Sequence, residues 1–579
     1  MSSFDHSLGI ASLNIGIGGL SLQLFHIAKR AFSTYTGALS FDDTSAILKA
    51  KLVIEESRLS RWGDALGIPD TFTLPDVAEY LQISEIKEKT PLEDASLVLL
   101  SSAIQVLLSD LEVLKSRYGL STAAGPALAA PAGVSTLPPP VTAAIIASQS
   151  GTAEMTSWLQ RMASLIPSRG KIRWAVTGQE RSERLVKELK DINDSLFALL
   201  PYPCCKDVGR AVVEELTSTE EWRVLHKFAE AAKSQNASIY TMATAKEVAI
   251  RAGSALLSRL SPENLSISPS LIAIDSENPI AVTGTYTSPT GDVRILIEWK
   301  KYKGDLKSNP DKFKRLLTRI ENIAQALHQD PKPKGFLTLN CLKFFDDSKE
   351  DRFGFVFGHP PGSDPLSNPI SLRMLYDARK KDKQLLLGER FSLAALISNS
   401  VYEFHCANWF HKSINPKNVL FFKKRDGEID VLSPFLTGFE YSRLDQDSEY
   451  TEPPESDYLY RHPDYQTAED RDTLDETSEL KYRREYDIYA LGLVLFEIGA
   501  WRPLQDFKRE DDRHTLRKNL LETYIPRLGV TMGAIYRDVV LACISDKFEV
   551  KEGQVVQPKM EFLKEFRWHI VKQLEECKA

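Results

Sequence analysis

H-K-S-I-N-P-K-N-V-L-F-F, residues 411–422, sets the architecture of the C-terminal half of the chain. Polar residues dominate its first eight positions, and four consecutive apolar residues follow. This pattern predicts a loop that runs into a short buried strand. The third residue of the loop, Ser413, carries no charge at neutral pH, so it cannot accept a proton as a carboxylate does.

Two downstream segments, L-T-G-F-E at residues 436–440 and D-I-Y-A-L-G at residues 487–492, extend the pattern. In order and spacing, the three segments resemble the catalytic loop H-R-D-L-x-x-x-N, the D-F-G segment and the start of the central helix of protein kinases. The resemblance implies a two-lobed α+β domain over about residues 265–579, with an N-lobe over about 265–352 and a C-lobe over about 363–579. The alternative is a chance match in an unrelated helical domain.

The resemblance also implies that the chemistry has been lost. A kinase needs an Asp at the third place of the loop and an Asn five residues later to hold a metal ion. Ser413 replaces that Asp, Gly438 replaces the magnesium-binding Asp, and Asn418 is retained. We therefore expect no metal site, no enzymatic activity and no intact catalytic residue. The degenerate positions are His411, Lys412, Ser413, Gly438, Phe439 and Glu440.

Nucleotide binding is doubtful on the same grounds. Residues 293–300 predict a strand that ends at Lys300, where kinases have a phosphate-contacting lysine. Glu298 shares the face of Lys300 and replaces a small alanine, and no G-x-G-x-x-G segment precedes the strand. Lys300 and Asn418 are the candidate ATP-binding residues, with Glu321 as a possible partner of the lysine. The alternative for Lys300 is an ordinary solvated strand lysine, and we expect no cofactor.

The N-terminal residues 7–28 contain no Asp, Glu, Lys or Arg. A helix of that length reaches about 33 Å, enough to span a bilayer core, although its serines and glycines make it only moderately hydrophobic. Asp5 argues against a signal peptide. Three interpretations stay open: a buried core helix, a permanent anchor, or a helix that packs at rest and inserts when released. The candidate membrane-active residues are Leu8, Ile10, Leu13, Ile15, Gly16, Ile17, Gly18, Gly19, Leu20, Leu22, Leu24 and Phe25.

Helical periodicity dominates the rest of the N-terminal part. The segment Thr90-Pro91-Leu92-Glu93 is a helix-start signature. Residues 121–150 are rich in Ala and Pro and predict a flexible loop. The predicted helices cover residues 41–67, 90–119, 152–166, 180–200, 220–234 and 240–259.

The segment E-E-S-R-L-S-R-W-G-D-A-L-G-I at residues 55–68, and K-I-R-W-A-V at 171–176, carry a second resemblance. They are similar to the HeLo domain of filamentous fungi, of the prion-inhibition and propagation type. The resemblance implies that residues 1–235 form a helical bundle that kills the cell by attacking its membrane. Without it, the simpler interpretation of Glu55, Arg58 and Trp62 is a helix surface with one buried aromatic residue.

Charge and cysteine content indicate which partners and which cell compartment are compatible with the chain. The formal net charge of −7 argues against nucleic-acid binding. The six cysteines include no C-x-x-C pair, which favours reduced thiols in the cytosol. We expect a mainly α protein with a HeLo-like bundle, a helical brace or linker at residues 236–264 and a kinase-like domain. By architecture this layout resembles the mixed lineage kinase domain-like proteins of animal necroptosis.

The expected function is a regulated cell-death effector that is cytoplasmic at rest and reaches the plasma membrane on activation. Its expected partners are membrane lipid, further copies of itself, and an upstream receptor or kinase. Hydroxyl side chains between residues 448 and 460 would change the local charge if phosphorylated. Two other function classes stay open: an active or weakly active Ser/Thr protein kinase with a helical docking module, and a scaffold with neither activity.

Overall fold

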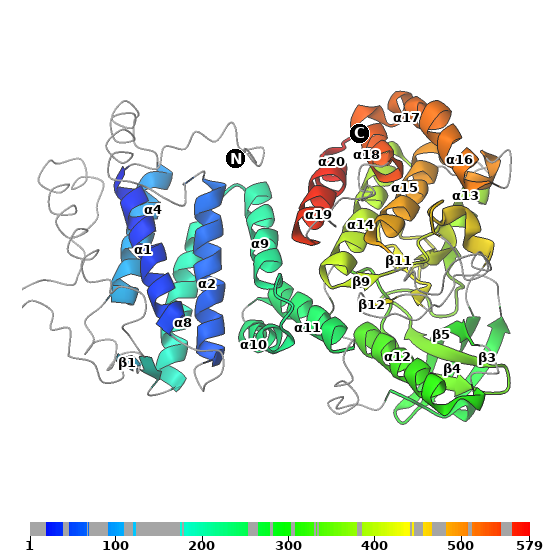
Figure 1. Cartoon of the computed structure of the whole chain (residues 1–579), viewed down its shortest axis with the longest axis horizontal. Coiled ribbons are helices and arrows are strands. Elements are labelled where there is room, and N and C mark those ends of the chain that lie inside the picture. Colours follow the sequence, from blue (N-terminus) through cyan, green and yellow to red (C-terminus); the bar gives the residue numbers. More distant parts are fainter. Residues whose placement is uncertain are drawn as a thin grey trace, which may run out of the picture. The chain divides into compact units, whose positions relative to one another are not determined.

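The structure is a computed structural model, and it divides the chain into two compact units, residues 1–243 and 244–579 (Figure 1). Each unit is described by itself. The residues that the structure describes are 19–38, 46–66, 68, 91–108, 120–122, 174–176, 179–234, 236–252, 265–277, 282–302, 307–328, 332, 335–378, 385–439, 443–444, 455–465, 482–507, 512–545 and 559–579.

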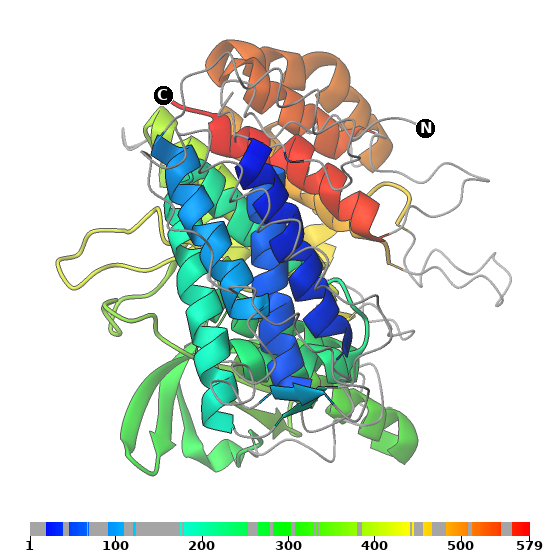
Figure 2. The same ribbon diagram turned by 90° about the vertical axis from the view of Figure 1, so that its left-hand side faces the viewer.

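The first unit is a helical bundle arranged around α2. Helix α2 packs against α1, α8, α9 and α10, and α4 packs against both α1 and α8. Figure 2 shows α1, α2, α4 and α8 side by side with their axes roughly aligned. The helices are α1 (Gly19–Ala38), α2 (Ala46–Ala65), α4 (Pro91–Leu108), α8 (Gln179–Ala198), α9 (Tyr202–Leu216), α10 (Trp222–Ala232) and α11 (Ala237–Ala252), which contains the boundary between the units.

The apolar spacing of α2 explains its central place. Leu48, Leu52, Leu59 and Trp62 recur at helical spacing and are all buried. The indole Nε1 of Trp62 donates a hydrogen bond to the Leu196 carbonyl of α8 at 2.8 Å, so the ring loses no polar contact on burial. The helix predicted over residues 41–67 is therefore confirmed, with α2 as its described part.

Helix α1 differs from the apolar segment expected to end at residue 28. It continues past Lys29 and Arg30 to Ala38. The reason is that its buried stripe does not stop there: Ala28, Ala31 and Phe32 are all buried. Apolar residues three and four apart keep one face in the core while the two basic residues lie off that stripe.

A small two-stranded sheet includes residues for which a loop was predicted. Strand β1 (Leu120–Thr122) pairs antiparallel with β2 (Trp174–Val176). Ser121 and Thr122 are thus strand residues, and the predicted loop boundary is wrong there. Local composition could not reveal this pairing, because the partner strand lies far along the chain. The rest of that loop and the helix predicted at 152–166 lie outside the described residues.

The second unit begins with a five-stranded antiparallel sheet in the order β3-β4-β5-β7-β6. Helix α12 (Pro310–His328) connects β5 to β6 and packs on β6. The strand predicted over residues 293–300 is confirmed as part of β5, whereas β6 was not predicted because its run C-L-K-F-F-D-D does not alternate cleanly. The strands are β3 (Ile272–Glu277), β4 (Val282–Ser288), β5 (Gly291–Lys301), β6 (Cys341–Asp347) and β7 (Arg352–Gly358).

The remainder of this unit is mainly helical and surrounds α15. Nearly every residue of α15 is buried, and it packs against α14, α17 and α18. An amphipathic stripe is absent because other elements cover the helix on all sides. The helices are α13 (Leu372–Ala378), α14 (Leu387–Cys406), α15 (Arg484–Ala500), α16 (Arg513–Asn519), α17 (Ile525–Thr531), α18 (Gly533–Ile544), α19 (Lys559–Phe566) and α20 (Lys572–Glu576).

Candidate functional site

Residues 411–418 form a buried loop that enters β10 (Val419–Phe421), as the sequence predicts. Strand β10 pairs antiparallel with β11 (Phe435–Leu436) and with β8 (Ile370–Ser371). This pairing brings the loop beside residues 437–439, which follow β11 directly. The two segments singled out in the sequence therefore meet in the fold.

Asp487 of α15 fixes the start of the loop. Its side chain is fully buried, and its two carboxylate oxygens accept hydrogen bonds from the backbone N–H groups of His411 at 2.8 Å and Lys412 at 2.9 Å. The Tyr482 hydroxyl donates to the same carboxylate at 2.8 Å. Although burial opposes ionisation, the hydrogen bond and charge of His405 lower the pKa of Asp487. Asp487 therefore anchors the loop as a carboxylate.

The Ser413 and Asn418 side chains contact each other. The Asn418 Nδ2 donates to the Ser413 carbonyl at 2.8 Å and to its Oγ at 3.0 Å. Asn415 adds a further contact, because its Nδ2 donates to the same carbonyl at 3.2 Å. The amide expected to face a metal ion is thus turned into the loop. Neither Ser413 nor Gly438 offers a carboxylate at this place.

Gly438 occupies a position that requires glycine. Its φ is +87°, and a Cβ built there would lie 2.3 Å from the Nδ2 of Asn418. The backbone N–H groups of Gly438 and Phe439 both donate to the Oε2 of Glu298, each at 3.1 Å. The neighbouring Glu440 lies outside the described residues.

Phe439 connects the Glu298 contact to the loop at residues 411–418. Its ring packs on the His411 imidazole with 4.7 Å between centroids, and on Phe404 and Trp409 at 5.6 Å. Burial lowers the pKa of His411 to about 4, so the imidazole is neutral at physiological pH. A neutral aromatic stack with no acid–base role fits these contacts.

Lys300 is 1% exposed, so its interpretation as a solvated lysine is wrong. The pairing suggested between Lys300 and Glu321 is also wrong. Glu321 is exposed on α12, whereas Lys300 is buried. The physical reason is the orientation of α12, whose buried stripe turns Glu321 towards solvent. That stripe comprises Leu316, Ile320, Ile323, Ala324 and Leu327.

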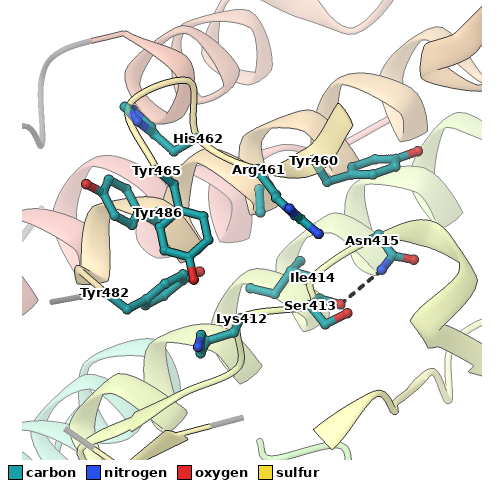
Figure 3. Close-up of a pocket in the computed structure, with 11 residues that line it drawn as sticks. Lys412, Ser413, Ile414, Asn415, Tyr460, Arg461, His462, Tyr465, Tyr482 and Tyr486 are labelled. Atoms are coloured by element: carbon teal, nitrogen blue, oxygen red, sulfur yellow. Dashed lines mark hydrogen bonds between the residues drawn. The ribbon is translucent and has the colours of Figure 1, made fainter. Parts of the chain in front are cut away.

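A small pocket lies between the loop and residues 460–486 (Figure 3). Its free space is about 10 Å³, the room needed by one water molecule. The Lys412 ammonium lies 5.3 Å from the centroid of the Tyr482 ring, a cation–π contact. Sequence reasoning missed this aromatic surround, because its tyrosines are scattered along the chain. The lining residues include Lys412, Ser413, Arg461, Tyr460, Tyr465, Tyr482 and Tyr486.

Side chains that could ligate a metal do not gather in the part of the chain that the structure describes. Within the ranges given above, no group of three or more His, Cys, Asp or Glu residues could hold a metal ion. The candidate site consists of the backbone and side-chain contacts described above.

In the first unit, the segment at residues 55–68 forms a polar clasp between α2 and α8. Glu55 is 1% exposed, and its Oε2 accepts from Arg58 at 2.9 Å and from Asn193 at 2.8 Å. Arg58 also pairs with Asp194 of α8. Burial outweighs these partners and raises the pKa of Glu55. The segment is therefore more than a helix surface with one buried aromatic residue.

Comparison with known proteins gives two family matches. Residues 12–228 match the family model HeLo, described as prion-inhibition and propagation. The N-terminal part of the chain is therefore similar to the HeLo family. Residues 296–578 match a second family model, DUF7580, described as a domain of unknown function. No curated protein matches the chain significantly.

Two residues of the candidate membrane-active segment lie in the core of the N-terminal bundle. Leu24 and Phe25 are 0% and 1% exposed. Gly19, Leu20 and Leu22 belong to α1, while Leu8, Ile10, Leu13, Ile15, Gly16, Ile17 and Gly18 lie outside the described residues. Among the helices that the structure describes, none combines the length and apolar character of a membrane span.

One close contact joins α1 to α2. A Cβ built on Gly63 would lie 2.2 Å from the Phe25 ring, so only glycine allows this approach. The Phe25 ring also packs against the Trp62 ring, with 6.1 Å between their centroids. The Thr36 hydroxyl donates to Glu56 of α2 at 2.7 Å. These contacts hold α1 along its described length.

Proposed function

We propose that this chain is a regulated cell-death effector of the fungal heterokaryon-incompatibility type. Its HeLo domain permeabilises the plasma membrane, and its C-terminal unit controls that activity. The match of residues 12–228 to the HeLo family carries the proposal. At rest the protein is cytoplasmic, and activation brings it to membrane lipid, where copies assemble. An upstream receptor or kinase supplies the trigger.

The packing of α1 supports a controlled release. Leu24 and Phe25 are buried, so the apolar face of α1 lies in the core at rest. Such burial is needed in a segment that must not insert into a membrane prematurely. In a helix formed over these positions, glycines 9, 16, 18 and 19 would each lower helix stability by about 1 kcal/mol relative to alanine. A weak N-terminal helix is easier to detach from the bundle.

A vesicle experiment tests the membrane activity. The full chain is incubated with dye-loaded vesicles that contain anionic lipid, and the rate of leakage is measured. We expect Leu20→Glu to abolish leakage, because a charge near the bilayer centre costs about 2.5–3.5 kcal/mol. The matched control is Gly37→Glu, which adds the same charge at an exposed position of the same helix where no atom is close to the new Cβ. If the unmodified chain leaks vesicles and folded Leu20→Glu protein leaks them at the same rate, the executioner role of α1 is refuted.

We also propose that the C-terminal unit is a kinase-like domain without phosphoryl-transfer activity. The sheet with its connecting helix, the Asp487-anchored loop and the Phe439–His411 stack support the kinase likeness. The absence of a carboxylate at positions 413 and 438 supports the loss of activity. Incubation with labelled ATP and a generic protein substrate should transfer no more label than a Lys300→Ala control. Robust transfer that the control lacks would favour the active-kinase alternative.

A further inference from the structure

The N–H groups of Gly438 and Phe439 converge on a single oxygen of Glu298. Two successive backbone donors, the first on a residue with φ of +87°, form a concavity of the kind that binds anions. Glu298 projects into this concavity from β5, well over one hundred residues earlier in the chain. The concavity is therefore an anion site that is already filled by a side chain of the same protein.

The surroundings of Glu298 favour a negative charge. Lys300 lies two residues along the same strand, so it shares the face of Glu298, and it is 1% exposed. Lys332 lies nearby: its Nζ donates to Thr338, which bridges to Leu436 two residues before Gly438. Burial raises the pKa of the Cys341 thiol to about 12. Among the neighbouring charges, Lys332 lowers this pKa and Glu298 raises it, so both groups act on the thiol.

Glu298 also determines where the neighbouring ring lies. The N–H that it accepts from Phe439 fixes the backbone whose ring stacks on His411. His411 is in turn held by Asp487. The carboxylate thus links β5 to α15 through a continuous series of contacts, and its loss frees the backbone donors at residues 438 and 439 together.

We propose that the backbone N–H groups of Gly438 and Phe439, together with Lys300, form a phosphate-binding site that Glu298 occupies in place of a ligand. The ligand class is a phosphate group, either free or at the end of a nucleotide. Glu298 and the phosphate compete for the same two donors, so the unmodified chain excludes the ligand. The inference concerns the C-terminal unit alone and holds whether or not the HeLo domain attacks membranes.

The test measures thermal unfolding of the full chain against increasing inorganic phosphate, with potassium chloride at matched ionic strength as the reference. Ligand that binds only the folded state raises the unfolding midpoint by mass action. We expect a saturable phosphate-dependent rise for Glu298→Ala and none for the unmodified chain. The double variant Glu298→Ala/Lys300→Ala should lose the rise. Asp275→Ala is the matched control, because it removes a carboxylate of the same sheet that pairs with Arg294 instead.

Further titrations of Glu298→Ala with ADP and ATP, with and without magnesium, identify the source of the phosphate. A response to phosphate equal to that for nucleotides indicates a small-anion site, and a response at much lower nucleotide concentration indicates a nucleotide site. A folded Glu298→Ala chain with the same midpoint in phosphate and chloride would overturn the proposal. An equal phosphate response in the unmodified chain would overturn it too.

A second measurement decides the case if Glu298→Ala does not fold. Glu298→Gln keeps the size and one acceptor but removes the charge, and should show a phosphate-dependent rise in the unfolding midpoint that the unmodified chain lacks. Amide hydrogen exchange is also measured on the unmodified chain for peptides covering residues 435–440. Slow exchange at residues 438 and 439, unchanged by phosphate, supports the occupied site. Fast exchange there contradicts it.

Discussion

Backbone geometry at position 438 makes this residue sensitive to any side chain. Gly438→Asp would restore an acidic residue, but its Cβ would lie 2.3 Å from Asn418 and its φ of +87° is strained for non-glycine residues. We expect a loss of roughly 1–3 kcal/mol in the free energy of unfolding and no gain of phosphoryl transfer, even with Ser413→Asp. Chemical denaturation measures the first effect.

The control for this prediction is Gly427→Asp. Gly427 has nearly the same φ, +88°, but no atom lies within 4 Å of a Cβ built there. Both variants carry the backbone strain, and only Gly438→Asp adds the clash. Equal losses in the two variants would show that the contact with Asn418 contributes nothing to stability.

Glu497 of α15 gives the protein a pH dependence. Its carboxyl is wholly buried and accepts a hydrogen bond from the Tyr460 hydroxyl at 2.9 Å and another from the Leu504 N–H. Burial raises its pKa from 4.5 to about 8. Between these values the folded state binds more protons than the unfolded state, so stability falls as pH rises through this window, by at most about 1.4 kcal/mol per pH unit.

Glu497→Gln should remove this contribution, because an amide oxygen accepts the same two hydrogen bonds without titrating. We expect the difference in unfolding free energy between pH 6 and pH 9 to be smaller in the variant than in the unmodified chain. Chemical denaturation at the two pH values checks this. An identical difference in both proteins would mean that Glu497 stays ionised in the folded state.

Sequence reasoning singled out segments of the candidate site and missed their partners. The spacing of residues 411–418 and 436–440 drew attention to both segments, and β10 and β11 bring residues 436–439 beside the loop. The contact between Glu298 and residues 438–439 was not predictable, because it joins segments far apart in the chain. Glu321 shows the same limit, because the sequence did not reveal which face α12 buries.

At the scale of elements, the contact between α1 and α2 depends on one glycine. Gly63→Ala places a methyl group about where the Phe25 ring now lies, so α1 must shift away from α2. Overpacking of this kind costs about 1–3 kcal/mol. We expect a lower unfolding midpoint and, because α1 is easier to release, faster vesicle leakage.

The matched control for Gly63→Ala is Gly209→Ala in α9. Gly209 is also a helical glycine, but nothing lies within 4 Å of its Cβ position. Alanine there should stabilise the chain by about 1 kcal/mol through helix propensity alone and leave leakage unchanged. If Gly63→Ala is as stable as the control and leaks no faster, the close approach of α1 to α2 has no role in restraint.

Element prediction succeeded where the pattern is local. The cap signature at Thr90-Pro91 marks the start of α4 at Pro91, and the buried leucines of α2 follow their 3.6-residue spacing. It failed where pairing is distant, as between β1 and β2, or where a mixed pattern hid a strand, as in β6. The polar clasp of Glu55, Arg58 and Asn193 was not predicted, because buried polar contacts between helices have no periodic signal in the sequence.

For the whole molecule, the division into two compact units predicts two unfolding transitions. Each unit has its own apolar core, one around Trp62 and one around α15. Trp62→Ala removes a fully buried side chain and should cost about 3–5 kcal/mol, lowering only the transition of the first unit. Gly438→Asp should lower only that of the second. Differential scanning calorimetry of the full chain measures both midpoints.

The outcome also bears on the proposed control of the N-terminal unit by the C-terminal unit. Control requires a coupling free energy between the units, commonly about 1–3 kcal/mol, which would make each variant shift the other transition slightly as well. Two fully independent transitions would mean that restraint, if present, acts only through membrane or partner binding. A single transition lowered by both variants would contradict the two-unit description, because the chain would then unfold as one cooperative structure.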